Sequence, residues 1–426
     1  MANEEGSKFK DTILGKIPKE WNICKLDDLS TDISYGYTTS ATEDRVGPKF
    51  LRITDIVHSS INWDKVPFCK IDNKEKYKLK EGDIVIARTG ASTGSFALID
   101  KDYDAVFASY LIRFKFDKSL ISPLYVSYIL HSQLWTNFIS ASIKGSAQPG
   151  INAKELCEFM LPVPSLLEQQ RIGNFLKTFD SKIVLNQKMN KVLEAIAQAI
   201  FKHWFIDFEF PNIEGKPYKS SGGEMVDSEL GEIPKNWTIK KIDEIANFLN
   251  GLALQKYPAI TENDYLPVIK IKEMNSGISE SSDKASREIP SEYIVHNGDV
   301  LFAWSGSLGV TIWCSGEGAL NQHLFKVSSD EYPKWFYYEW LLHYLPDFIE
   351  IARDKATTMG HIQRHHLSDS LVAVPDSNTL EIMNNVLKPI IDRIINLRVD
   401  SNTLTKTRDL LLPSLLSGKI RVPLEE

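Results

Sequence analysis

The chain has 426 residues, of which 43% are hydrophobic and 25% charged, and its formal net charge is −7. This length predicts two or more domains of an ordinary globular protein. The first residues lack an apolar signal core, and no stretch reaches the roughly 18 uninterrupted apolar residues of a membrane span, so we expect a cytoplasmic protein. Four scattered cysteines without a C-x-x-C pair predict free thiols and exclude a zinc ribbon or redox motif.

Residues 1–160 are predicted to mix short strands with helices. The strand signals are runs of Ile, Val, Leu and Phe bounded by Gly, Asp or Pro, at Phe50–Ile56, Gly82–Ala87 and Leu111–Phe116. The stretch Ile121–Ser140 is apolar but interrupted by polar residues, which predicts an amphipathic helix with one buried face.

Residues 161–210 are predicted to form a long helix. After a Pro-x-Pro turn at 162–164, apolar positions recur with alternating spacings of four and three, the 3.5-residue repeat of a coiled-coil seam. The seam consists of Ile172, Leu176, Phe179, Ile183, Asn186, Asn190, Leu193, Ala197, Ile200 and Trp204. The Gly-, Pro- and Ser-rich segment 211–227 then predicts a surface linker.

The second half of the chain repeats this order. Strands are predicted at Leu266–Lys272, Gly298–Trp304 and His323–Val327, and an amphipathic helix at Lys334–Ala352. A second seam follows Pro375 and consists of Leu380, Met383, Leu387, Ile390, Ile394, Leu397, Ser401, Leu404, Arg408, Leu411 and Leu415.

Polar residues fall near the middle of both seams. If the two helices run antiparallel, Asn186 and Asn190 meet Ser401, and such a buried polar layer fixes register at some cost in stability. On this hypothesis, leucine at both asparagines raises the melting temperature. The alternative is that the asparagines face solvent at a local bulge.

An internal duplication organises the chain. LGKIPKEWNICKLDDL (14–29) and LGEIPKNWTIKKIDEI (230–245) agree at nine of 16 positions, at an offset of 216 residues. We therefore predict an α+β fold of two tandem α/β domains, each followed by a long helix, with the helices packed as an antiparallel coiled coil under pseudo-twofold symmetry. The predicted boundaries are 1–160, 161–210, 211–227, 228–375 and 376–426.

Motifs for catalysis and metal binding were sought. There is no Walker sequence, G-x-S-x-G elbow or Asn-Pro-Pro-Tyr motif, and Asp207 with Glu214–Lys216 lies in a Pro/Gly linker that gives a nuclease site no rigid support. His361 and His365 could share a helical face, and Asp369 is within reach, but no nearby Cys or paired carboxylate completes the four ligands of a closed zinc site. We predict no catalytic and no metal site, and favour the 361–366 segment as a phosphate- or base-contacting loop over a polar surface turn.

Several segments resemble the conserved stretches of one family. They are LGKIPKEW and LGEIPKNW, then LPVPSLLEQQRI (161–172), AIFKHWFIDFEFP (199–211) and LLLPSLLSGKIRV (410–422). Together with the repeat, they cover nearly the whole chain and resemble the specificity subunit of type I restriction–modification systems.

The resemblance implies a non-catalytic subunit of an adenine DNA methyltransferase and ATP-dependent endonuclease complex in a bacterial or archaeal cytoplasm. Each recognition domain would read one half of a bipartite, asymmetric double-stranded DNA target. The helices would set the spacer length and dock two methyltransferase subunits, which motor-nuclease subunits join. The chain would bind no cofactor itself, since S-adenosylmethionine, ATP and Mg²⁺ belong to the partners.

Two alternatives stay open on the sequence. The chain could be an assembly scaffold whose globular domains bind protein, or a self-contained DNA-modifying enzyme. The absence of nucleotide, S-adenosylmethionine and metal motifs argues against the enzyme. Exchange of a recognition domain, scored by the methylated motif, separates the scaffold from the specificity subunit.

Candidate DNA contacts were chosen by side-chain chemistry, since Arg and Lys suit guanine or phosphate while Gln and Asn suit adenine. For each of them a solvated loop is the alternative. In the first copy they are Tyr35, Tyr37, Thr38, Thr39, Arg52, Arg88, Thr89, Ser92, Lys144, Ser146 and Gln148. In the second copy they are Asn250, Gln255, Lys256, Lys270, Lys272, Trp304, Ser305, Ser307, Thr357, His361, Gln363 and Arg364.

Charge differs between the two copies. Residues 1–165 carry 21 basic and 21 acidic side chains, whereas residues 220–375 carry 13 and 22. This balance predicts weak, salt-sensitive DNA binding by the isolated chain, with the methyltransferase subunits supplying much of the phosphate contact. Trp21 and Trp237 are predicted to be core anchors, because their apolar neighbours repeat with them.

Overall fold

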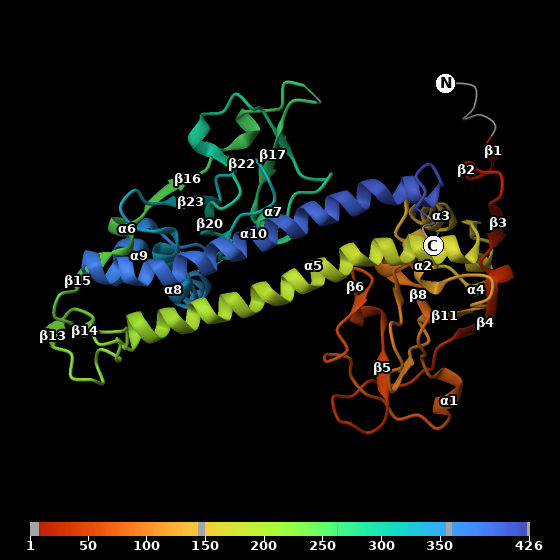
Figure 1. Ribbon diagram of the computed structural model, residues 1–426, viewed down its shortest axis with the longest axis horizontal. Helices are drawn as coiled ribbons and strands as arrows, with labels where there is room; N and C mark the ends of the chain where they lie inside the picture. The colour runs from red at the N-terminus through yellow and green to blue at the C-terminus, as the bar shows by residue number, and fades with distance from the viewer. Residues whose placement is uncertain (1–7, 144–149, 262, 355–359, 424–426) are drawn as a thin grey trace. The chain divides into compact units, whose positions relative to one another are not determined.

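The computed structural model describes residues 8–143, 150–261, 263–354 and 360–423 (Figure 1). It divides into two compact units, Met1–Ser181 with Thr405–Glu426, and Lys182–Leu404. The long helices α5 (Leu166–Phe201) and α10 (Ser377–Leu416) both continue from one unit into the other. None of the helices in the described part of the chain is long and apolar enough to cross a membrane.

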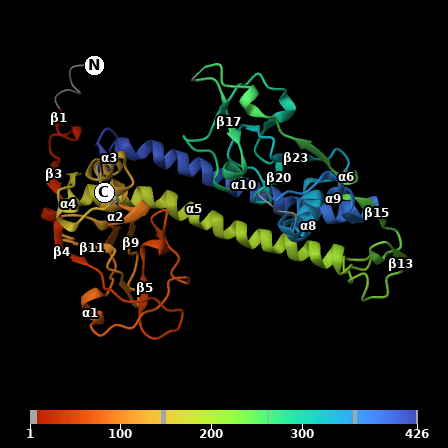
Figure 2. The same ribbon diagram turned by 180° about the vertical axis from the view of Figure 1, so that it is seen from behind.

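Unit 1 is built on a four-stranded antiparallel sheet in the order β4-β11-β8-β9. This sheet lies nearer α5 than the parallel pair β5-β10 and the helix α1 do (Figure 1 and Figure 2). The strands are β1 (Phe9–Thr12), β2 (Gly15–Pro18), β3 (Asn22–Lys25), β4 (Ser30–Tyr35), β5 (Lys49–Leu51), β6 (Ile56–Val57), β7 (Ser60–Ile61), β8 (Ile84–Ala87), β9 (Phe96–Leu98), β10 (Ala105–Phe107), β11 (Leu111–Phe116) and β12 (Met160–Val163). The helices are α1 (Lys74–Tyr77), α2 (Pro123–Leu130), α3 (Gln133–Ser142) and α4 (Ala153–Cys157).

Unit 2 repeats this plan with the sheet β16-β23-β20-β21 and a second sheet β18-β17-β22-β19. The strands are β13 (Met225–Ser228), β14 (Gly231–Pro234), β15 (Thr238–Lys241), β16 (Asn247–Asn250), β17 (Leu266–Ile269), β18 (Lys284–Ala285), β19 (Ile294–Val295), β20 (Val300–Ala303), β21 (Gly309–Ile312), β22 (Gly318–Leu320), β23 (Leu324–Ser328) and β24 (Leu371–Val374). The helices are α6 (Ile242–Ile245), α7 (Ile271–Ser276), α8 (Lys334–Asp354) and α9 (Arg364–Ser368). The predicted α+β fold of two tandem domains with long helices is therefore confirmed.

Three predicted elements were too long. The strand predicted at Phe50–Ile56 stops at Leu51, because the Asp55 carboxylate accepts hydrogen bonds from the backbone and side chain of Arg52 and closes a 3-10 turn. The strand predicted at Leu266–Lys272 gives way to α7 at Ile271. The predicted helix Ile121–Ser140 is two helices, because the Ser132 hydroxyl bonds back to the Ile129 carbonyl and ends the first.

The core of each unit includes the end of a helix that starts in the other. In unit 1, Leu412, Leu415 and Leu416 of α10 are buried with Trp21 and Tyr125. In unit 2, the last turns of α5, including a π-helical turn at Lys202–Ile206, bury a group of aromatic side chains against Trp237 and α8. These aromatic residues are Phe201, Trp204, Phe205 and Phe210. Since apolar burial supplies most of the stability of a fold, each unit needs both helices.

A group of polar contacts connects three of the family-like segments in unit 1. The buried Glu168 carboxylate accepts hydrogen bonds from the Trp21 indole at 3.2 Å and from the Arg421 guanidinium at 2.9 Å. The Arg421 guanidinium also bonds Glu20, which lowers the pKa of that carboxyl. The neighbouring Gln169 is fully buried and bonds three backbone groups. These three segments therefore contribute buried polar contacts to the interior of unit 1.

Within each unit α5 and α10 run antiparallel. In unit 2, Glu194 pairs with Arg398 at 2.7 Å and the Asn186 amide donates to Asp400 at 2.8 Å. In unit 1, Asp180 pairs with Arg408. Of the predicted seam residues, the buried ones are Ile172, Leu176, Asn186, Asn190, Ala197, Trp204, Met383, Leu387, Ile394, Leu397 and Leu415. Those that are partly exposed are Phe179, Ile183, Leu193, Ile200, Leu380, Ile390, Ser401, Leu404, Arg408 and Leu411.

The two seam asparagines differ in how well their polar atoms are satisfied. The carbonyl oxygens of Asn186 and Asn190 are both buried and meet no donor among the described residues. The Asn186 amide nitrogen is bonded to Asp400. A buried, unpaired polar atom costs about 1–3 kcal/mol.

We predict that Asn190→Leu stabilises unit 2. Removing the unpaired carbonyl raises the melting temperature by about 2–4 °C for a unit of about 200 residues, measured by calorimetry. Asn186→Leu raises it less, because the bond to Asp400 is lost. The exposed Gln187→Leu on the same helix is the control and leaves the melting temperature unchanged; a fall for Asn190→Leu would contradict the prediction.

Unit 2 also buries a carboxyl group. Glu339 on α8 is 2% exposed, and burial, with a smaller contribution from the Glu194 carboxylate, raises its pKa to about 8. The Glu194 carboxylate is in turn paired with Arg398.

This carboxyl makes stability depend on pH. The pKa of Glu339 is 4.5 in the unfolded chain and about 8 in the folded unit. Between these two pH values the carboxyl is ionised in the unfolded chain but protonated in the folded unit. The contribution of Glu339 to stability is therefore complete below pH 4.5 and is lost progressively as pH rises to about 8. We predict that Glu339→Gln melts increasingly above the parent protein as pH rises from 5 to about 8; parallel melting profiles would exclude this role.

Candidate nucleic-acid interface

One end of the central sheet places matched residues in the two units. In unit 1, β11 pairs Ile112 with Tyr35 and Leu111 with Ala87. In unit 2, β23 pairs Phe325 with Asn250 and Leu324 with Ala303. By this register Tyr35, Arg88 and Tyr110 occupy the same positions as Asn250, Trp304 and His323. We call these two sets the Tyr35 cluster and the Asn250 cluster.

The Tyr35 cluster is arranged around a stacked arginine. The Arg88 guanidinium lies over the Tyr35 ring, 5.1 Å from its centroid, which is a cation–π contact. The Arg88 Nε is buried and meets no acceptor in the described ranges. The Tyr35 hydroxyl accepts from the Ala153 amide at 3.0 Å, and the Tyr110 carbonyl accepts from the Arg88 amide. The side chain of Tyr110 is 60% exposed.

The Asn250 cluster is held by side-chain hydrogen bonds. The Trp304 indole N–H donates to Asn250 Oδ1 at 3.0 Å. The Ser305 hydroxyl lies 2.9 Å from His323 Nδ1. The rings of His323 and His361 lie 6.2 and 6.4 Å from the Trp304 ring.

The backbone around both clusters is the same. Gly36 and Gly251 follow the first cluster residue, and a Cβ atom there would lie 2.2 and 2.3 Å from the carbonyl oxygens of Ala108 and Asn321. Both positions therefore require glycine. After the second cluster residue, Thr89 bridges to Gly150 as Ser305 bridges to His361. Two different sets of side chains thus stand on one scaffold.

The other candidates of the first copy lie around the Tyr35 cluster or apart from it. Tyr37 packs against Tyr77, 5.3 Å between ring centroids, and is half-buried. Arg52 makes a bidentate pair with Asp55, which raises the pKa of Arg52, so in the free chain its guanidinium faces a carboxylate. Thr38 and Thr39 follow β4, and Ser92 ends the 3-10 turn after Thr89. Lys144, Ser146 and Gln148 lie outside the described residues.

The candidates of the second copy are more dispersed. Gln255 and Lys256 are exposed on a 3-10 turn, and Ser307 is exposed after Gly306. Lys270 pairs with Asp283, and Lys272 donates to Ser281 at 3.0 Å. Gln363 caps α9, and Arg364 donates to the Phe248 carbonyl at 3.2 Å. Thr357 lies outside the described residues.

Two cluster members were missed by the sequence analysis. Tyr110 comes directly before β11, which pairs with β4 and β8. His323 comes directly before β23, which pairs with β16 and β20. The repeat is offset by 216 residues at Ala87 and Ala303 but by 213 at Leu111 and Leu324, so a constant offset does not align them. Aligning the strands themselves would have found the pair.

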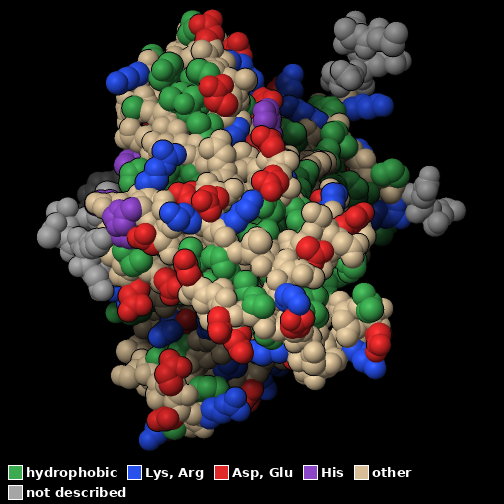
Figure 3. Space-filling view, turned by 90° about the vertical axis from the view of Figure 1, so that its left-hand side faces the viewer, with side chains coloured by type: hydrophobic (Ala, Val, Ile, Leu, Met, Phe, Trp, Pro, Cys, Tyr) green, Lys and Arg blue, Asp and Glu red, His purple; other side chains and the backbone are tan. Residues whose placement is uncertain are grey.

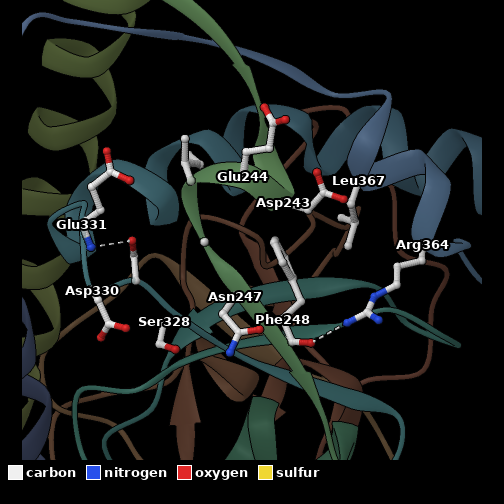
Figure 4. A pocket seen from close by; sticks show the side chains of 12 residues that line it. Asp243, Glu244, Asn247, Phe248, Ser328, Asp330, Glu331, Arg364 and Leu367 are labelled. Carbon is white, nitrogen blue, oxygen red and sulfur yellow. Dashed lines mark hydrogen bonds between the residues drawn. The ribbon is translucent and has the colours of Figure 1, made fainter.

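Unit 2 has an acidic pocket at the Asn247 end of β16, the opposite end of that strand from Asn250. This pocket of about 530 Å³ is lined by the carboxylates of Asp243, Glu244, Asp330 and Glu331, with Arg364 at one side (Figure 4). Several lysines elsewhere in the unit are paired, as Lys240 is with Glu331 at 3.5 Å. Acidic and basic side chains are interspersed across the face displayed in Figure 3. Within the described ranges no group of three or more His, Cys, Asp or Glu side chains could hold a metal.

The fold and these surfaces define a duplicated binding protein, and comparison with known proteins gives its family. The family model described as type I restriction modification DNA specificity domain matches residues 18–195 and again residues 234–404. The chain belongs to this family. Its members are specificity subunits, which recognise DNA targets for restriction–modification systems and are non-catalytic, without a cofactor of their own.

Two relatives match along nearly their full length. The chain is 26% identical to the type I restriction enzyme MjaIX specificity subunit of Methanocaldococcus jannaschii, over 98% of this chain and 97% of that protein. It is 22% identical to the HindI specificity subunit of Haemophilus influenzae, over 94% and 100%. The S subunit of a type I system from M. genitalium shares the fold, with a TM-score of 0.59, 14% identity and coverage of 93% and 96%.

The paired lysines and the acidic pocket lead to a prediction about DNA affinity. The isolated chain binds duplex DNA with a Kd weaker than nanomolar at physiological salt, and affinity falls about 10-fold or more between 50 and 200 mM salt. Fluorescence anisotropy with a labelled duplex of mixed sequence measures this backbone component. Nanomolar binding by the lone chain at physiological salt would contradict it.

Proposed function

We propose that each unit reads one half of a bipartite, asymmetric DNA target. The observation that carries this proposal is the presence of two units with one sheet order and one strand register in a single chain. Two copies of one recognition fold suit two similar segments of a duplex, as in dimeric repressors. Because the units differ in their exposed side chains, the half-sites need not be palindromic.

We further propose that α5 and α10 set the number of unread base pairs and dock two methyltransferase subunits. In support, both helices are long, with 36 and 40 residues, and both continue from one unit into the other. S-adenosylmethionine would be bound by these partners, and ATP and Mg²⁺ by the motor-nuclease subunits that join them. A protein-binding scaffold is the alternative function, and it predicts that the units can be exchanged without changing the DNA target.

Domain exchange tests the proposal. Residues 1–160 are replaced by the matching segment of a family member that directs a different methylated motif, and the hybrid is expressed with its methyltransferase subunit. We expect only one half of the methylated motif to change, because the second unit and both helices are retained. Sequencing that detects methylated adenine gives the readout.

The reciprocal exchange of residues 228–375 is the matched control and should change only the other half. A hybrid that assembles with the methyltransferase and directs the parent motif would favour the scaffold and refute half-site reading. Purification of the complex separates this outcome from failed assembly.

A further inference from the structure

We propose that the Tyr35 cluster and the Asn250 cluster are base-reading sites, each of which contacts the edge of one base pair in the major groove. The residue types at the three matched positions then decide which base is accepted. This assignment presupposes the proposed function, and it gives Tyr110 and His323 a place in recognition beside four residues already named.

The contrast between each cluster and its neighbours points to this role. Each cluster position has one neighbour that is identical in the two units, since Gly36 matches Gly251, Ala87 matches Ala303 and Leu111 matches Leu324. The three cluster positions themselves differ, from Tyr to Asn, Arg to Trp and Tyr to His, and so do the neighbours on their other side. The two glycines are fixed by the close approach of a backbone carbonyl, whereas side chains that read different half-sites must diverge.

The chemistry of the Tyr35 cluster suits guanine. Stacking on Tyr35 fixes the plane of the Arg88 guanidinium, and the buried Nε has no acceptor among the described residues. A fixed guanidinium offers two parallel N–H donors, and guanine presents two acceptors, O6 and N7, in the major groove. Tyr110 is exposed beside it and supplies a hydroxyl that can donate or accept.

The chemistry of the Asn250 cluster suits adenine. The indole N–H of Trp304 can only donate, so its bond fixes which side of the Asn250 amide carries the oxygen. The oxygen keeps a second lone pair. The amide nitrogen donates to the Gly251 carbonyl at 3.5 Å and keeps a second donor, so the amide still offers the combination that pairs with N6 and N7 of adenine. The Ser305 hydroxyl, 2.9 Å from His323 Nδ1, orients the His323 ring.

Single substitutions test both sites in the full chain, expressed with its methyltransferase subunit and scored by sequencing of methylated adenines. Arg88→Ala should relax discrimination about 10-fold or more at one position of one half-site. Asn250→Ala should do so at one position of the other half-site. Arg45→Ala and Asn385→Ala, at exposed residues outside the clusters, are the matched controls and should keep the parent motif.

Trp304→Phe tests whether the indole positions the amide. Phenylalanine keeps the ring packing but removes the donor, so the Asn250 amide is free to turn over. We expect relaxed discrimination at the same base position as in Asn250→Ala, with methylation at all other positions unchanged. A role in packing alone predicts the parent motif.

A triple substitution tests the assignment if Arg88→Ala does not fold. Tyr35→Asn, Arg88→Trp and Tyr110→His together give unit 1 the Asn250 cluster, and we expect the base read at one position of its half-site to change. Uniformly weaker methylation of an unchanged motif would instead identify phosphate contacts and overturn the assignment.

These experiments also distinguish a failure of the base-reading assignment from a failure of the proposed function. If these variants retain the parent motif while domain exchange still replaces a half-site, the clusters do not read bases and the proposed function stands. If domain exchange leaves the motif unchanged as well, the proposed function fails together with this assignment.

Discussion

Each core is completed by the end of a helix that starts in the other unit, and the fold depends on this constraint. Trp21 is buried in one core with Leu415 near the end of α10, and Trp237 packs against Phe205 and Phe210, which follow the end of α5. Neither half of the sequence contains all of its own core, so the folding unit differs from the sequence repeat. Because apolar burial is cooperative, the two helices and both recognition folds are coupled in stability.

The same constraint acts on the segments that resemble the family. Trp21, Glu168 and Arg421 come from three segments that resemble the family, and they bond one another in the interior and at the edge of unit 1. Their identity is required by packing and by the cost of leaving a buried carboxylate unpaired. The ends of the sheets are free of that requirement, and there the two units differ.

The sequence predicted the parts of the fold that local patterns determine. Hydrophobic periodicity located β11 and both long helices, and the repeat identified two units. Hydrophobic periodicity made the strand at Phe50–Ile56 too long, because it does not detect the i,i+3 contact between Asp55 and Arg52 that closes a 3-10 turn. Tyr35 and Arg88 were identified by residue type, but the sequence could not place them together or add Tyr110, since their proximity comes from the pairing of separate strands, Ile112 with Tyr35 and Leu111 with Ala87.

The acidic balance of unit 2 is compatible with DNA recognition if affinity and specificity come from different groups. Phosphate contacts supply most of the affinity and depend on net positive charge, which unit 2 lacks. Base contacts depend on oriented donors and acceptors rather than on net charge, and the Asn250 cluster offers an amide, an indole and an imidazole held by hydrogen bonds. On the proposed function, an acidic unit with such a site would discriminate between bases but hold DNA weakly. It would then rely on cationic surfaces of its partners, which would couple recognition of the target to assembly of the complex.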